Sequence, residues 1–436
     1  MRRPRAITLR LAAVTAASAA VTAACGITHA GTSGLAAGPT GTPITIGISE
    51  PLSGPNSAQG FAADGQACLK GYELWASDVN SHGGLLGHPV KLIVMNDRGW
   101  PASTIYDYNW LIKHDHVDLV LAPFSSLLTK FAAPTTQKLG YALVAGSAGA
   151  PSVFTLGAAD HNLFSTTIPV AQELMPFAKW IAGVRGHPLT AAYPMVSDPF
   201  ADPPVTTAKN YLGTHGIKAL LYPGVNGYTK VSNAALTADA KMVVKRNPGI
   251  VVLGSVAVPT VELFMHVFAL NGYTPKYFIA TSGPDQGQAF LNQVGTGNAV
   301  GMMVPNGWYG GYANALSHVM VQDYIARYGG TASTINGDVA ESYSAGQVIA
   351  AAVRATGGTN QAQIIAWLHR PTTSVQTVVG KVAFGPKGDN TLAGQTASVF
   401  QWQTPTGGGA PQFVEVLRGN GAVQTTPVTK APLTKS

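Results

Sequence analysis

From Pro43 onward, short apolar runs alternate with amphipathic stretches, and this alternation restricts the possible folds more than any other feature. The apolar run 44–48 is followed by a helical pattern over 65–80 and by a second apolar run over 90–95. A strand, a helix and a strand in that order favour a parallel sheet covered by helices.

The same alternation continues along the chain, with further helices opening near Ser103 and over 128–139. At 436 residues the chain exceeds the size, about 250 residues, at which single hydrophobic cores stop growing. We therefore expect an α/β protein with two mostly parallel sheets flanked by helices. Apolar runs predict the remaining strands at 117–122, 141–145, 190–193, 219–222, 250–253 and 277–280.

The N-terminus has the layout of an export signal. Basic residues extend to Arg10, and an apolar run of small residues follows from Leu11 to Ala24. This run is shorter than the ~20 residues that cross a bilayer, and no later run is long and apolar enough. We expect residues 1–24 to be a signal peptide and no transmembrane helix to remain.

Cys25 follows Thr22-Ala23-Ala24, which resembles the lipobox of bacterial lipoproteins, although Thr22 stands where that pattern usually has Leu. Lipidation of Cys25 would anchor the protein to the outer face of the cell membrane. The alternative is cleavage after Ala24, which leaves a free or disulfide-bonded thiol on a soluble secreted or periplasmic protein. The uncharged segment 25–42 is predicted to be a flexible tether.

Charge and cysteine content narrow the function classes. Four of the 27 basic residues and none of the 20 acidic ones precede Cys25, which leaves 23 basic residues and a net charge of +3. The basic residues are scattered, so a nucleic-acid partner is not expected. The only cysteines are Cys25 and Cys68, so the fold must be stabilised by its hydrophobic core and not by several disulfides. The helical spacing of the residues around Cys68 places that side chain in the core.

Several ordered segments carry a resemblance to a known family. They are 46–55, 78–90 with Asp97 after it, and more weakly 384–389 and 400–402. Through them the chain resembles, over nearly its whole length after Cys25, the branched-chain amino-acid binding proteins of bacterial ABC importers, a periplasmic-binding-protein family.

The resemblance implies a two-lobed type I fold in which the chain crosses between lobes near Ile168, Pro305 and Val382. Lobe one would comprise 43–168 with 306–381, and lobe two 169–305 with 382–417. The polar tail 418–436 is expected to hang loose.

The resemblance also implies a function. Such a protein captures a small solute, an amino acid or a related carboxylate or amide, by closing its hinge and delivers it to an ABC permease. We expect a monomer without cofactor or metal that is not an enzyme. A ligand sensor of the same fold remains an alternative, as does a hydrolase of unknown chemistry.

Candidate ligand contacts follow the strands predicted to end at the cleft. By resemblance, Ser125 and the segment Ser147, Ala148 and Gly149 would hold a ligand carboxylate, with Gly149 offering only its backbone N–H. The alternative for Ser125 is a helix N-cap. Phe200 would close over the ligand from lobe two, and Gln59 would line the entrance.

The position of the family's amine-holding carboxylate falls near Ser282, with Asp285 the nearest acid. Trp100, Phe124 and Trp308 lie in predicted cleft loops and could form an aromatic wall. The sequence contains no Gly-x-Ser-x-Gly, His-Glu-x-x-His or phosphate-binding Gly-Lys-Ser/Thr motif. His114-Asp115-His116 is interpreted as a solvated loop.

Overall fold

In the computed structural model, residues 38–436 form one compact unit. The structure describes residues 38–54, 61–155, 162–196, 198–222, 232–312, 314–392 and 397–435, together with the backbone of 224–225. The predicted signal peptide, Cys25 and Gln59 lie outside these ranges.

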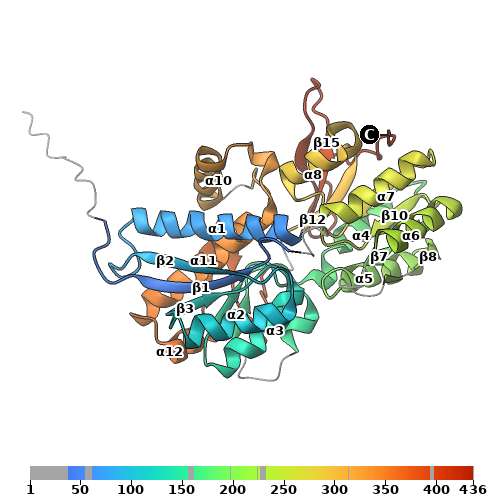
Figure 1. Cartoon of the computed structure of the whole chain (residues 1–436). Helices are drawn as coiled ribbons and strands as arrows, with labels where there is room; N and C mark the ends of the chain where they lie inside the picture. Colours follow the sequence, from blue (N-terminus) through green and yellow to red (C-terminus); the bar gives the residue numbers. More distant parts are fainter. Residues whose placement is uncertain are drawn as a thin grey trace, which may run out of the picture. The chain divides into compact units, whose positions relative to one another are not determined.

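The first lobe is built on a five-stranded parallel sheet in the order β2-β1-β3-β4-β5. Alternate strand residues face opposite layers: Ile46 and Leu121 pack with one group of helices, and Val120 and Leu143 pack with the other. Figure 1 shows α1 and α11 beside this sheet and α2 and α3 on its other side. The strands are β1 (Ile44–Glu50), β2 (Val90–Asn96), β3 (Leu119–Leu121), β4 (Leu143–Ala145) and β5 (Leu163–Ser165). The helices are α1 (Phe61–Ser81), α2 (Pro101–Lys113), α3 (Ser126–Lys138), α10 (Ala315–Tyr328), α11 (Gly337–Thr356) and α12 (Gln361–Leu368).

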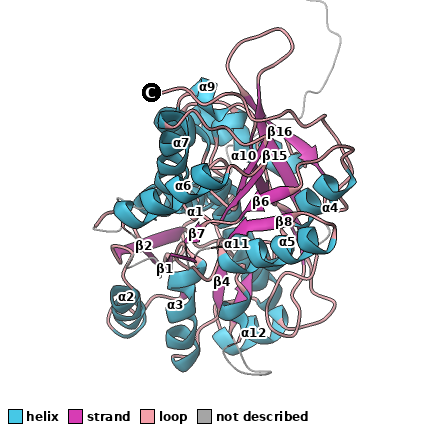
Figure 2. Cartoon of the chain, turned by 90° about the vertical axis from the view of Figure 1, so that its right-hand side faces the viewer, coloured by secondary structure: helices cyan, strands magenta, loops and turns pink. Residues whose placement is uncertain are grey.

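The second lobe is built on a seven-stranded sheet in the order β16-β15-β12-β11-β10-β6-β8, in which only β15 runs opposite to the other strands and pairs antiparallel with both β12 and β16. Helices α4 and α5 cover one face, and α6 and α7 cover the other (Figure 2). Helix α8 packs on the same side as α6 and α7. The strands are β6 (Thr190–Ala192), β8 (Lys218–Leu221), β10 (Ile250–Leu253), β11 (Tyr277–Ala280), β12 (Met302–Asn306), β15 (Ser398–Gln403) and β16 (Gln412–Leu417). The helices are α4 (Met175–Gly183), α5 (Asp202–Thr214), α6 (Asn233–Arg246), α7 (Val258–Leu270), α8 (Gly287–Val294) and α9 (Thr296–Ala299).

Two short two-stranded sheets complete the unit: β7 (Met195–Val196) with β9 (Gly224–Val225), and β13 (Val375–Thr377) with β14 (Gly380–Val382). The prediction of an α/β fold with two mostly parallel sheets is confirmed. Within the described part of the chain, none of the helices combines the length and apolar character that a membrane span needs.

Helices α1 and α11 approach each other closely because small residues meet bulky ones between them. A Cβ added at Gly346 would overlap the ring of Trp75, which is fully buried, and one added at Gly71 would overlap the carbonyl of Val339. This contact fixes the start of α11, which contributes to the site described below, against the first sheet.

The C-terminal tail corrects the expectation of a loose end. The side-chain amide of Gln401 makes two hydrogen bonds with the backbone of Val428. Its oxygen accepts from the N–H of Val428 at 2.9 Å, and its nitrogen donates to the carbonyl of Val428 at 2.8 Å. Further along, Lys430 is buried and its ammonium donates to the carbonyl of Val300 at 2.9 Å. These hydrogen bonds tie the polar tail to the second lobe.

Candidate functional site

A cavity of about 620 Å³ opens where strands of both sheets end. The first lobe contributes the turns after β3 and β4 and the start of α11, and the second contributes the turns after β7, β10, β11 and β12. The lining residues named below are Phe124, Ser125, Ser126, Ser147, Gly149, Thr167, Ile168, Glu173, Phe200, Val256, Ser282, Asp285, Pro305, Asp338 and Glu341.

Most of the residues singled out from the sequence line this cavity, and three do not. The ones that do are Phe124, Ser125, Ser147, Gly149, Phe200, Ser282 and Asp285.

The three exceptions have other environments. Ala148 is fully buried in the core beneath α3. Trp308 is 1% exposed and its indole N–H donates to Ser317 at 2.8 Å, so it is a core residue with a satisfied polar atom. Trp100 is 39% exposed at the start of α2 and belongs to the surface.

Ser125 occupies the N-cap position of α3, but its side chain makes no capping hydrogen bond. The neighbouring Ser126 accepts a hydrogen bond from the N–H of Ala150 at 3.2 Å. The hydroxyl of Ser125 therefore does not have the alternative role of a helix N-cap that the sequence allowed. Ser125 lines the cavity at the positive end of α3.

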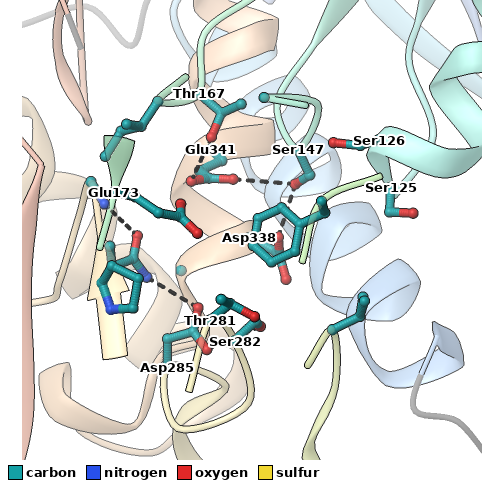
Figure 3. Close-up of a pocket in the computed structure, with 18 of the residues that line it drawn as sticks. Ser125, Ser126, Ser147, Thr167, Glu173, Thr281, Ser282, Asp285, Asp338 and Glu341 are labelled. Carbon is teal, nitrogen blue, oxygen red and sulfur yellow. Dashed lines mark hydrogen bonds between the residues drawn. The ribbon is translucent and has the colours of Figure 1, made fainter. Parts of the chain in front are cut away.

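Ser147 was expected to hold a ligand carboxylate, but its hydroxyl contacts two carboxylates of the protein. Its hydroxyl lies 2.8 Å from Oδ1 of Asp338 and 3.3 Å from Oε2 of Glu341, while Thr167 donates to Oε1 of Glu341 at 3.2 Å. Asp338 and Glu341 stand one turn apart on α11, and Figure 3 shows them beside Ser147. The hydroxyl thus positions carboxylates of the protein itself.

Two carboxylates come from the second lobe. Asp285 accepts hydrogen bonds from the N–H of Gly283 at 2.8 Å and the hydroxyl of Ser282 at 3.2 Å. Glu173, which follows the short 3-10 helix Val170–Gln172, is only 6% exposed, and its Oε1 has no hydrogen-bond partner among the described residues. Figure 3 shows its carboxylate directed into the cavity, between Glu341 and Asp285.

The two lobes touch beside the cavity. Gln286, which precedes α8, donates to Oδ2 of Asp64 on α1 at 3.0 Å. Val256 and Phe200, from loops of the second lobe, pack against the apolar core of the first. The cavity is therefore closed off on this side by contacts between the lobes.

Comparisons with known proteins match this geometry. A family model described as periplasmic binding protein matches residues 43–410. This chain belongs to that family. It is a binding protein of the extracytoplasmic space rather than an enzyme, as the sequence predicted.

Individual binding proteins are similar to this chain over most of its length. A Leu/Ile/Val-binding protein from Rhizobium johnstonii is 24% identical over 83% of this chain and 92% of its own length. The benzoate complex of an ABC-transporter solute-binding protein from R. palustris has a TM-score of 0.69 at 16% identity and covers 89% of this chain and 99% of that one. A leucine-binding protein from Thermotoga maritima has a TM-score of 0.69 at 15% identity, covering 86% and 99%. These two structures show a shared fold.

The cavity of this binding protein is acidic. Burial raises the pKa of Asp285 to about 6, and burial followed by the nearby Asp285 carboxylate raises that of Asp338 to about 7. Burial and the nearby Asp338 raise the pKa of Glu341 well above its usual range. Burial, Asp285 and Glu341 likewise raise the pKa of Glu173 well above its usual range. No Lys or Arg side chain lines the cavity among the described residues.

Three of the four carboxylates were missed by reasoning from the sequence. Asp338 and Glu341 have the i, i+3 spacing that places two side chains on one helix face, so this pair could have been found. Glu173 follows a single 3-10 turn, and nothing in its local sequence indicates that it reaches the cavity.

Within the described residues, no group of three or more His, Cys, Asp or Glu side chains is arranged to hold a metal ion.

Proposed function

We propose that this binding protein captures a small solute bearing an ammonium group, closes its lobes around it and delivers it to an ABC permease. The observation that carries the proposal is the cavity between the ends of both sheets, with Ser125 at a helix N-terminus and the Asp338–Glu341 pair on α11. A buried ammonium needs a carboxylate partner, and this pair offers two.

An amino acid, or a related carboxylate or amide, suits these groups. Its carboxylate would accept from Ser125 and from backbone N–H groups near Ser147 and Gly149, at the positive end of α3. Its apolar part would lie against Phe124, Phe200, Val256 and Ile168, which line the same cavity. The relatives described as leucine-binding and as a solute-binding protein of an ABC transporter support import over sensing.

Closure is proposed to occur about the three connections near Ile168, Pro305 and Val382. They would join lobe one (43–168 with 306–381) to lobe two (169–305 with 382–417). Ile168 and Pro305 both line the cavity, so a solute held there contacts the connections themselves. Only contacts that a solute makes with both lobes favour the closed state.

We also propose that the protein is exported and anchored to the outer face of the cell membrane. Residues 1–24 would direct export, a lipid on Cys25 would hold the protein at the outer face of the cell membrane, and residues 25–42 would act as the tether. The basic start, the short apolar run and the uncharged segment after Cys25 support this.

A thermal-shift screen of the twenty amino acids and of small amines and carboxylates, followed by calorimetry with the best compound, tests the function. A compound at 100 times its Kd should stabilise the protein by about 2.7 kcal/mol. Failure of every compound containing an amine, together with a clear shift from a neutral or purely anionic one, would contradict the proposal.

Two serine variants separate binding from capping. Ser125→Ala should weaken binding of the best compound by roughly 1–3 kcal/mol and leave stability nearly unchanged, because its hydroxyl caps nothing. Ser232→Ala is the matched control: Ser232 accepts from the N–H of Ala235 at 3.2 Å and caps α6, so this variant should lose about 1 kcal/mol of stability and keep its binding. Equal binding by Ser125→Ala and wild type would remove Ser125 from the site.

A further inference from the structure

The cavity is lined by more acidic side chains than the single ammonium group of a simple amino acid can pair with. Glu173, Asp285, Asp338 and Glu341 all line it, with no Lys or Arg among its described lining residues. Lys381 lines a smaller neighbouring cavity that Glu341 shares, but the Lys381 side chain is exposed. One ammonium pairs with one or two of these groups, and the carboxylate of a neutral amino acid adds a further negative charge.

Glu173 identifies where a second cation would bind. Glu173 is more than nine-tenths buried, and its Oε1 has no hydrogen-bond partner among the described residues. The Glu173 side chain faces the cavity (Figure 3). The other three carboxylates each accept hydrogen bonds from hydroxyl, amide or backbone groups. An unsatisfied buried carboxylate at a cavity wall is a costly arrangement unless a ligand supplies its partner.

The acidic side chains come from two parts of the cavity wall, one belonging to each lobe. Asp338 and Glu341 belong to α11 of the first lobe, whereas Glu173 and Asp285 come from segments that precede α4 and α8 of the second. A solute with one positive charge contacts one wall strongly. A solute with a positive charge at each end contacts both, and it therefore favours closure.

We infer that the cavity selects an amino acid with a cationic side chain, whose α-ammonium binds Asp338 and Glu341 and whose side-chain cation binds Glu173. This inference rests on the proposed function and names its substrate class. The aliphatic stem of such a side chain packs against Val256 and Phe200, and Glu173 is the residue that distinguishes a cationic side chain from an apolar one of equal length.

Calorimetric titration with L-lysine and with L-norleucine tests this directly, because the two differ by the ammonium group at the end of the same chain. Wild-type protein should bind lysine about ten-fold or more tightly than norleucine, since a desolvated charge pair with a carboxylate is strong. Glu173→Gln should reduce this preference to about three-fold or less while leaving norleucine affinity nearly unchanged. Glu262→Gln on α7, which removes the same charge at a residue that lines a different cavity, should keep the wild-type preference.

Two results would overturn the inference while leaving the proposed function in place. They are norleucine binding as tightly as lysine to wild type, and an unchanged preference in a folded Glu173→Gln. The wild-type comparison stands even if that variant fails to fold. Binding of neither compound would overturn the inference, and the thermal-shift screen described above would then decide the proposed function separately.

Discussion

Replacing Asp285 and Asp338 by Asn should flatten the dependence of stability on pH. In the ligand-free protein these carboxyl groups have pKa values of about 6 and about 7, against an ordinary value of 3.8. The folded state thus holds protons that the unfolded chain releases. The stability that these protons contribute is fully present below about pH 4 and is lost as the pH rises through 6 and 7.

The magnitude follows from these values. Between pH 5 and pH 8 the wild type should lose roughly 1 kcal/mol through Asp285 and roughly 3 kcal/mol through Asp338. Together this is roughly 4 kcal/mol, or roughly 5 °C in Tm for a chain of this size. The double variant Asp285→Asn/Asp338→Asn should lack this part of the decline, and the pKa values of Glu173 and Glu341, which Asp285 and Asp338 help to raise, should fall as well.

Thermal and urea unfolding of both proteins from pH 5 to pH 8 provides the assay. Other buried groups with shifted pKa values, such as Asp97, Asp198 and Lys430, are present in both proteins and cancel in the difference. L-lysine should stabilise the wild type more at pH 8 than at pH 5, because it binds the ionised carboxylates. Parallel stability curves for the two proteins would refute the conclusion that Asp285 and Asp338 are desolvated.

Three further predictions concern closure, packing and anchoring. Phe200→Ala should weaken solute binding by roughly 1–2 kcal/mol through lost apolar burial and leave more of the saturated protein open; small-angle scattering with and without lysine measures this, and an unchanged wild-type radius of gyration at saturation would argue against a hinge. Gly346→Ala should destabilise the protein by roughly 1–3 kcal/mol because its Cβ overlaps Trp75, whereas Gly183→Ala, with no neighbour within 4 Å, should be neutral or slightly stabilising in urea unfolding; equal stability of the two variants would contradict the close packing of α1 and α11. Cys25→Ala should release the protein from membrane fractions or leave the signal uncleaved, and unchanged fractionation and processing would exclude lipidation.

The fold could be predicted because its signal is repeated and local. Each buried strand is a short apolar run, and β10 and β11 were predicted to the residue as 250–253 and 277–280. The turns that follow parallel strands meet at one edge of a sheet, and this geometry together with the family resemblance predicted that Ser125, Ser147 and Asp285 lie in one cleft; all three line the same cavity.

What could not be predicted depends on packing between distant segments. Trp308 was expected in the cleft because it follows a strand, yet its indole N–H finds Ser317 and turns the ring into the core. Glu173 reaches the cavity only because the chain turns after β5 toward the second lobe. The tail is polar in composition, but Gln401 and the carbonyl of Val300 supply partners that its own sequence does not reveal.

A crystal structure of the full-length protein after signal cleavage, grown with L-lysine, tests the central claim most directly. We expect lysine in the cavity between the lobes, with one nitrogen about 3 Å from Asp338 or Glu341 and the other about 3 Å from Glu173. Lysine bound elsewhere on the surface, with water alone between these carboxylates, would contradict the claim that this cavity is a binding site for a cationic solute.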